Sequence, residues 1–332
     1  MNGKNILITG GTGSFGQMFT EHVLNNYSPK KLIIFSRDEC KQYNMAQRFS
    51  PDTYPCLRYF IGDVRDRERL YRAFSDVDIV IHAAALKHVP IGEYNPMEVI
   101  KTNIIGASNV IEAAIDKGVK KVLALSTDKA AAPINLYGAT KLCSDKLFIA
   151  GNSYVGENRG TVLSVVRYGN VMSSRGSVIP FFIEQKTNGC LPITDPRMTR
   201  FWTTLGQSVR FVLKCLDNMV GGEIFIPKLP SMGIMDLAEA IAPGCKTRVV
   251  GVRPGEKLHE VLVPRDEARN TLEYGHHFII KPTLSFFDER MKPNGGKPVA
   301  EDFEYNSKTN PVKLTVEQLR KEVERYDPLR QA

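Results

Sequence analysis

Two pairs of residues between positions 126 and 141 could carry out proton chemistry. Tyr137 and Lys141 are four positions apart, so they share one face if this stretch is helical. A phenol has a pKa of about 10 and becomes a base near neutral pH only where a cation lowers that pKa. Lys141 supplies such a cation, and Thr127 at the end of a predicted strand can hydrogen-bond the same substrate oxygen. The arrangement predicts removal of a proton from a hydroxyl group.

The second pair, Asp128 and Lys129, combines an acid and a base at adjacent positions. Such neighbours suit a reaction in which one group donates a proton while the other accepts one. Lys129 must be neutral to accept a proton. Asp128 favours the charged form of Lys129, whereas burial near Lys141 favours its neutral form. The sequence leaves this balance open, and it leaves open the alternative that Lys129 is a loop lysine that forms a salt bridge.

These residues need a scaffold, and the chain is long enough for two domains. Its 332 residues exceed the roughly 250–300 at which a single core stops growing. The N-terminal half alternates short aliphatic runs with longer amphipathic stretches, which is typical of a parallel sheet covered by helices on both faces. Strands are predicted at 5–9, 31–35, 57–61, 78–81, 121–126 and 162–168, and helices at 15–25, 67–74, 98–117 and 136–150. This predicts an α/β fold with a doubly wound parallel sheet of the Rossmann type.

The stretch ITGGTGSFG follows the first predicted strand and opens the first predicted helix. In that context Gly11-x-Gly13-x-x-Gly16 is typical of a dinucleotide-binding loop, where a tight turn and close contact with a pyrophosphate require small residues. An oxidised nicotinamide bound there would add positive charge beside Tyr137. The residues expected to contact the dinucleotide are Gly10, Thr12, Gly13, Ser14, Phe15, Gly16, Ser36, Arg37, Asp63, Val64, Ala84, Lys87, Tyr137 and Lys141.

The end of the second predicted strand indicates which dinucleotide is bound. An NAD-binding chain carries an acid there for the ribose 2′-hydroxyl, whereas this chain has Ser36 and Arg37, which suit a 2′-phosphate. We therefore predict NADP. Asp38 keeps NAD as an alternative, since a shift of one residue would direct its carboxylate at the ribose. Asp63 ends the third predicted strand and could accept a hydrogen bond from the adenine or cap the next helix.

The alternation of strands and helices breaks after Tyr168, and prolines punctuate the rest of the chain. We expect residues 1–170 to form the NADP-binding domain. Residues 171–332 are expected to form mainly a smaller substrate-binding domain, with some segments returning to the sheet. Near the end, Thr315 and Gln318 can form a capping box that starts a helix.

The composition argues against several other classes of protein. The net charge of +8 is interleaved along the chain with 36 acidic residues, without the basic block typical of nucleic-acid binding. No apolar run approaches the roughly 18 residues of a membrane span, and no signal peptide is evident, so we expect a cytoplasmic protein that does not bind membranes. The six cysteines form no C-x-x-C pair and the six histidines are dispersed, so no metal site is predicted.

From the glycine loop through Thr127 and Tyr137-x-x-x-Lys141 and on toward RPGEK, the sequence resembles the extended short-chain dehydrogenase/reductase family. Within that family the chain is similar to the inverting UDP-N-acetylglucosamine 4,6-dehydratases that begin pseudaminic acid synthesis. That similarity covers roughly residues 5 to 283 and rests on stretches such as HAAALKHVP, LSTDKAA, PITDPRMTRFW and RPGEKLHEVL. The resemblance implies UDP-N-acetylglucosamine as substrate, NADP that stays bound and is recycled in each turnover, and a homo-oligomer, specifically a hexamer. It does not decide whether the product serves flagellin glycosylation, a capsule or another glycan.

The resemblance also implies a role for each residue of the two pairs. Tyr137 takes the proton of the sugar 4-hydroxyl while hydride leaves carbon 4. Asp128 then acts as the acid at carbon 6 and Lys129 as the base at carbon 5, where retaining relatives carry an Asp-Glu pair. Return of a proton to the opposite face of carbon 5 gives UDP-2-acetamido-2,6-dideoxy-β-L-arabino-hex-4-ulose.

The substrate is expected to meet polar residues from three segments. A diphosphate suits arginine and a ribose diol suits a carboxylate. The expected substrate-binding residues are Lys87, Asn170, Arg175, Ser177, Arg253 and Glu256, with structural salt bridges as the alternative for the charged ones. Two other functions stay open. A sugar-nucleotide 4-epimerase or ketoreductase would need Tyr137 and Lys141 but not the second pair, and an NADP-sensing regulator would bind the cofactor without turnover.

Overall fold

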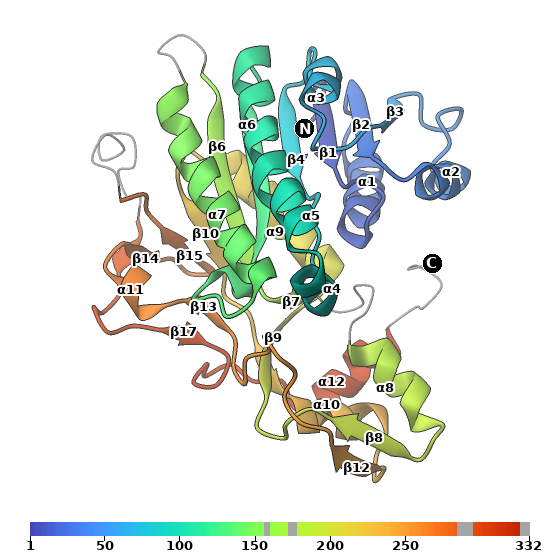
Figure 1. Ribbon diagram of the computed structural model, residues 1–332, viewed down its shortest axis with the longest axis vertical. Helices are drawn as coiled ribbons and strands as arrows, with labels where there is room; N and C mark the ends of the chain where they lie inside the picture. Colours follow the sequence, from blue (N-terminus) through green and yellow to red (C-terminus); the bar gives the residue numbers. More distant parts are fainter. Residues whose placement is uncertain (156–159, 172–177, 284–294, 326–332) are drawn as a thin grey trace.

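The computed structural model describes residues 1–155, 160–171, 178–283 and 295–325. Its centre is a ten-stranded sheet in the order β16-β14-β15-β10-β6-β5-β4-β1-β2-β3 (Figure 1). The strands from β10 to β3 are parallel, and β15, β14 and β16 are antiparallel to their neighbours. The strands are β1 (Asn5–Thr9), β2 (Lys31–Ser36), β3 (Leu57–Ile61), β4 (Ile79–His82), β5 (Lys121–Thr127), β6 (Val162–Tyr168), β10 (Ile224–Pro227), β14 (Thr271–Glu273), β15 (His277–Ile280) and β16 (Lys297–Pro298).

The predicted doubly wound sheet is confirmed. The order β3-β2-β1-β4-β5-β6 reverses direction beside β1, as a doubly wound sheet does. All five residues of β1 are buried, because helices cover both faces of the sheet, and this explains why the strand reads as the continuous aliphatic run NILIT. Each of the six predicted strands lies within one residue of its predicted ends.

Three of the four predicted helices are also found, as α1 (Ser14–Asn26), α3 (Arg67–Ala73) and α7 (Leu136–Gly151). The predicted helix at 98–117 is also helical throughout, but it contains a π-helical turn that was not predicted: α5 (Pro96–Ile100) passes through this turn (η1, Lys101–Ile105) into α6 (Gly106–Lys117). In that turn the side chain of Asn103 bonds both the amide and the carbonyl of Leu86, so the wider turn directs a buried amide group at the loop after β4. Helices α2 (Glu39–Arg48) and α4 (Val89–Tyr94) were not predicted.

Helices pack on both faces of the sheet (Figure 1). On one face α3, α6 and α7 contribute residues such as Leu70, Ala113 and Phe148 to one hydrophobic core. On the other face α1 and α9 (Leu205–Asn218) contribute Phe19 and Val212 to a second core. The two cores hold the carboxyl ends of the parallel strands rigidly at one edge of the sheet.

A smaller lobe with a third core lies beyond this edge (Figure 1). Ile179, Leu237 and Leu319 are buried in it. The predicted capping box of Thr315 and Gln318 is confirmed at the start of the last described helix. The remaining elements are β7 (Asn170–Val171), α8 (Val178–Lys186), β8 (Cys190–Ile193), β9 (Thr199–Thr203), β11 (Ser231–Gly233), α10 (Ile234–Ile241), β12 (Lys246–Val249), β13 (Val261–Val263), α11 (Arg265–Ala268), β17 (Tyr305–Asn306), α12 (Val316–Glu324) and two 3-10 turns, η2 (Asp128–Ala130) and η3 (Asn152–Tyr154). Within the described residues, none of the helices has the length and apolar character needed to span a membrane.

Candidate active site

A cleft of about 1130 Å³ lies at the carboxyl ends of the parallel strands, where ligands bind in sheets of this kind. Its wall is formed by residues of the sheet on one side and of the smaller lobe on the other. Arg175 and Ser177, expected to bind substrate, lie outside the described residues. The other predicted site residues all line this cleft: Gly10, Thr12, Gly13, Ser14, Phe15, Gly16, Ser36, Arg37, Asp63, Val64, Ala84, Lys87, Thr127, Asp128, Lys129, Tyr137, Lys141, Asn170, Arg253 and Glu256.

The glycine loop at one end of the cleft fits a dinucleotide pyrophosphate. Gly10 has a φ of +66°, which favours glycine, and a Cβ atom at Gly16 would overlap the carbonyl oxygen of Gly11. Helix α1 begins after Gly13, which offers no side chain to cap the free N–H groups of the first turn. Because no capping side chain accepts hydrogen bonds from these N–H groups, they can donate to the anionic oxygens of a phosphate bound in the cleft.

At the expected ribose end, Arg37 and Asp38 have different partners. The Arg37 guanidinium lies 3.6 Å from Asp63 and lines the cleft. The Asp38 carboxylate instead caps α2, accepting a hydrogen bond from the amide of Lys41 at 2.9 Å and pairing with its Nζ at 2.7 Å. Asp66, rather than Asp63, caps α3. Lys41 also lines the cleft, and the sequence did not predict it because α2 was missed.

Tyr137 and Lys141 lie on the first turns of α7, whose N-terminus is capped by Asn135. Burial raises the pKa of Tyr137 to about 12, and Lys129 acts in the opposite direction. Lys141 is 3% exposed, and burial lowers the pKa of its amine while Asp145, one turn further along the helix, raises it. Lys129 of the second pair is therefore a cation that favours the phenolate form of Tyr137.

The second pair forms an ion pair in the cleft. Nζ of Lys129 lies 3.0 Å from Oδ1 of Asp128, and the hydroxyl of Thr127 donates to the same oxygen at 2.9 Å. The Asp128 side chain is buried, whereas that of Lys129 is 26% exposed. Burial would lower the pKa of Lys129, but the carboxylates of Asp128 and Glu260 outweigh it, and its pKa lies above the ordinary value. In this state Lys129 is an ammonium.

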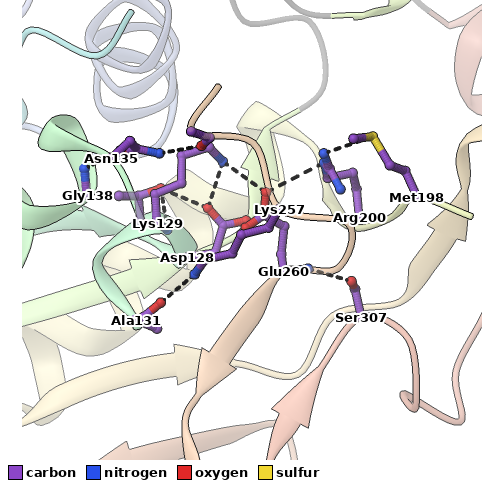
Figure 2. A network of polar contacts seen from close by, with 12 residues as sticks. Asp128, Lys129, Ala131, Asn135, Gly138, Met198, Arg200, Lys257, Glu260 and Ser307 are labelled. Atoms are coloured by element: carbon purple, nitrogen blue, oxygen red, sulfur yellow. Dashed lines mark hydrogen bonds and ion pairs between the residues drawn. The ribbon is translucent and has the colours of Figure 1, made fainter. Parts of the chain in front are cut away.

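Figure 2 shows that this ion pair belongs to a larger polar network, which the sequence did not predict. Glu260 lies 3.5 Å from Lys129 and 3.6 Å from Arg200 of β9. Lys257 donates a hydrogen bond to the carbonyl of Ala131 at 2.6 Å. The signal for Lys257 and Glu260 is the charged stretch GEKLHE, which indicates a site only once its place beside Asp128 is known.

A second network of buried ion pairs connects β6, α7 and α11. The guanidinium of Arg167 in β6 is fully buried and pairs with Asp145 at 3.5 Å and with Glu267 at 2.7 Å. The hydroxyl of Ser126 donates to Asp145 at 2.8 Å. This network holds the carboxylate that acts on Lys141 in place, since each of its partners is itself fixed in a strand or helix.

On the substrate side, Glu256 has a buried Oε2 with no hydrogen-bond partner among the described residues. A buried carboxylate oxygen that lines a cleft and lacks a partner suits a ligand hydroxyl. Asn170 of β7, Arg253 and Lys87 line the same cleft. In the described part of the chain, no group of three or more His, Cys, Asp or Glu side chains could hold a metal ion.

A doubly wound sheet, a glycine-rich loop before α1, and a Tyr-x-x-x-Lys helix facing the same cleft together define the extended short-chain dehydrogenase/reductase class. Residues 6–282 match the model of a family described as polysaccharide biosynthesis protein, and the chain belongs to that family.

Known proteins are similar to this chain over most of its length. A UDP-N-acetylglucosamine 4,6-dehydratase (inverting) from Campylobacter jejuni is 56% identical over 319 residues, covering 94% of each chain. A UDP-glucose 4-epimerase from Rickettsia bellii is 46% identical over 285 residues, covering 83% of this chain and 82% of the relative. The solved structure of Pen from Bacillus thuringiensis has a TM-score of 0.87 and 38% identity, covering 98% of this chain and 99% of that one.

Proposed function

We propose that the protein is an inverting UDP-N-acetylglucosamine 4,6-dehydratase, a hydro-lyase that acts on a nucleotide sugar. The observation that carries the proposal is the Asp128–Lys129 ion pair at 3.0 Å, which lies in the same cleft as Tyr137. A 4,6-elimination needs an acid and a base beside the group that takes the proton of the 4-hydroxyl, and this cleft contains both. The relative from Campylobacter jejuni that is 56% identical bears the same name.

The first step concerns carbon 4. A bound nicotinamide supplies the acceptor for the hydride of carbon 4, the donor that later reduces carbon 6, and positive charge. Tyr137, as phenolate, takes the proton of the 4-hydroxyl, and Thr127 hydrogen-bonds the same oxygen. Lys129 favours the phenolate of Tyr137, whose pKa burial otherwise raises to about 12. We propose that Lys141, which lines the same cleft, adds to this effect.

The second step is the elimination. The new ketone acidifies the proton on carbon 5, which passes to the neutral amine of Lys129. The bond from carbon 6 to oxygen breaks, and the Asp128 carboxyl gives its proton to the leaving oxygen, which departs as water. Before this step the proton of the Lys129 ammonium passes to the Asp128 carboxylate. The pair therefore enters the elimination as amine and carboxylic acid and leaves it as ammonium and carboxylate, so its proton count is unchanged. The ion pair at 3.0 Å has the second of these forms.

The cofactor we propose is NADP, kept by the protein and recycled in each turnover. Two observations support it. Arg37 and Lys41 place two cations along the cleft near the end of β2, where a 2′-phosphate would lie. The Asp38 carboxylate, which would favour NAD at the ribose, is engaged by Lys41 at the start of α2. We propose the pyrophosphate contacts at the glycine loop and an adenine contact at Asp63.

For the substrate, we propose that Arg253 and Glu256 hold the nucleotide and that Asn170 and Lys87 meet the sugar and diphosphate, together with Arg175 and Ser177. The buried, unpartnered oxygen of Glu256 supports a contact with a ribose hydroxyl. This assignment gives residues 1–170 the cofactor and residues 171–332 most of the substrate.

After carbon 6 is reduced, return of a proton to the opposite face of carbon 5 gives UDP-2-acetamido-2,6-dideoxy-β-L-arabino-hex-4-ulose. We propose that this product enters pseudaminic acid synthesis in the cytoplasm. We also propose a homo-oligomer, a hexamer. Ile91, Tyr94 and Met97 on α4 and α5 support association, since they are large, apolar and exposed, Tyr94 by 88%. Light scattering with size-exclusion chromatography tests the oligomeric state.

The name of the Rickettsia bellii relative supports a second candidate, a nucleotide-sugar 4-epimerase. The deciding experiment mixes the purified protein with UDP-N-acetylglucosamine in deuterated water without added cofactor and follows proton NMR. A methyl signal, deuterium at carbon 5 and L-arabino couplings would support the dehydratase with inversion. A methyl signal with the original configuration would remove the inversion from the proposal. No methyl signal, even with NADP and other UDP-sugars, would favour the epimerase, which should also survive Lys129→Ala.

A further inference from the structure

Glu260 is a buried carboxylate behind the acid–base pair (Figure 2). It directly precedes β13, is 2% exposed and does not line the cleft. Its Oε1 lies 3.5 Å from Nζ of Lys129 and 3.6 Å from Nε of Arg200, and its Oε2 has no hydrogen-bond partner in the described part of the chain. Its amide donates to the hydroxyl of Ser307 at 2.9 Å, and the amide of Ser307 donates to its carbonyl at 2.8 Å. The carboxylate is therefore held on a fixed backbone.

Asp128 alone cannot give Lys129 a constant counter-charge during the elimination. Asp128 begins that step as a carboxylic acid and becomes a carboxylate only when its proton has passed to the leaving oxygen. An ammonium that forms on Lys129 while Asp128 is still protonated would lack a partner. An unpaired charge is strongly unfavourable in a site that is largely shielded from water.

We propose that Glu260 is a positioning residue that supplies this counter-charge and holds the Lys129 ammonium as it forms, an inference that rests on the proposed function. Glu260 exchanges no proton with the substrate, and Arg200 balances its charge. Asp128, Lys129, Glu260 and Arg200 are joined by ion pairs. Together these four groups have a formal charge of zero before and after the step. Asp128 can then act only as the acid that protonates the oxygen leaving carbon 6.

Several charged or titratable groups surround the Lys129 amine and take part in its titration. They are Asp128 on η2, Tyr137 on α7, Arg200 on β9, and Lys257 and Glu260 before β13. Burial alone would lower the pKa of Lys129, Asp128 and Glu260 raise it, and Arg200 lowers it. Removing the charge of Glu260 should therefore lower the pKa of Lys129, and removing that of Arg200 should raise it.

The test uses Glu260→Gln in the full chain with its retained cofactor, and UDP-N-acetylglucosamine deuterated either at carbon 4 or at carbon 5. We expect turnover to fall about tenfold, the effect of one pKa unit of interaction. The isotope effect from carbon 5 should grow and that from carbon 4 should shrink, because only the elimination is slowed. The alkaline limb of the pH profile reports loss of the last proton from the pair, and it should move to lower pH by about one unit.

Three further variants separate positioning from folding. Glu260→Asp keeps the charge and should keep the wild-type alkaline limb. Arg200→Gln should move that limb to higher pH. Glu223→Gln neutralises a buried carboxylate that bonds Ser164 outside the cleft, so it controls for lost stability and should leave the limb in place.

Equal slowing of both steps by Glu260→Gln, with unchanged isotope effects and an unmoved alkaline limb, would overturn the proposal. A limb that moves in the same direction for Arg200→Gln and Glu260→Gln would also contradict it. Failure of the proposed function looks different, because the wild-type protein itself would then form no methyl signal.

Discussion

The side-chain amide of Asn135 donates a hydrogen bond to the carbonyl of Gly255 at 2.8 Å, although the two residues are 120 positions apart. Lys257 makes a second such bond, to the carbonyl of Ala131 at 2.6 Å. The loop that carries the acid–base pair is thus tied at two points to the segment proposed to hold the nucleotide. Movement of one segment must strain the other.

Asn135 also caps α7, since its Oδ1 accepts a hydrogen bond from the amide of Gly138 at 2.7 Å. Asn135→Asp keeps this acceptor but cannot donate to Gly255, whereas Asn135→Ala loses both bonds. We expect the alanine variant to be less stable than the aspartate variant by about 1 kcal/mol in urea unfolding. The KM for UDP-N-acetylglucosamine should rise in both variants, and a wild-type KM for Asn135→Asp would show that the tie to Gly255 does not position the substrate.

Lys129→Met should affect both steps of the reaction. The elimination should fall by about 10²–10⁴-fold, the usual contribution of a general base. Because Lys129 opposes the burial that raises the pKa of Tyr137, its loss should raise that pKa further. The acid limb of nicotinamide reduction, measured by absorbance after mixing with substrate at a series of pH values, should then move to higher pH. The control is Lys146→Met, at an exposed position of α7, the helix that carries Tyr137. An acid limb that Lys129→Met leaves unmoved would mean that Lys141 alone is the cation that favours the phenolate.

Arg37→Ala tests the choice of cofactor. Loss of a charged contact to a 2′-phosphate should weaken NADP binding about 10–100-fold and leave NAD binding nearly unchanged. The measurement is the ratio of NADP to NAD released from the purified protein on denaturation. Arg65→Ala provides the control, because Arg65 also pairs with Asp63 but does not line the cleft. Equal effects of the two variants would favour a structural role for Arg37.

Gly16→Ala tests the close packing of the glycine loop. The new Cβ would overlap the carbonyl oxygen of Gly11, whereas a Cβ at Gly13 would lie 3.2 Å from the carbonyl oxygen of Gly10. We expect Gly16→Ala to lower the free energy of unfolding by about 1–3 kcal/mol, and Gly13→Ala to lower it less. Thermal unfolding of both variants compares them, and equal losses would mean that the loop relaxes around either methyl group.

The sequence predicted the sheet well because both faces of the parallel strands are buried. A run such as NILIT has no polar alternation, and its length and flanking glycines indicate a strand. Helix α2 gave no such signal, since only Gln42 and Met45 of its ten residues are buried. The π-helical turn at Lys101–Ile105 was also missed, because its cause is a tertiary contact of Asn103 with Leu86.

The first half of the candidate site was predictable for a related reason. Thr127, Lys129 and Tyr137 are close in the sequence, at the end of one strand and the start of the next helix, so local spacing places them together. Arg200 and Glu260 reach the same point from segments more than 70 positions away. Periodicity carries no information about such an approach, which depends on how the smaller lobe packs against the sheet.

The network around Lys129 draws its reacting groups from one half of the chain, whereas Glu260 and Arg200, which act on the pKa of Lys129 in opposite directions, come from the other. The two halves are therefore unsuited to exchange as independent modules. A chimera that takes residues 171–332 from a relative inherits a new electrostatic environment for its base along with a new substrate pocket. Divergence toward another sugar would in this way also retune the pH range of catalysis, and compensating changes would be selected among residues 1–170, the half that carries the reacting groups.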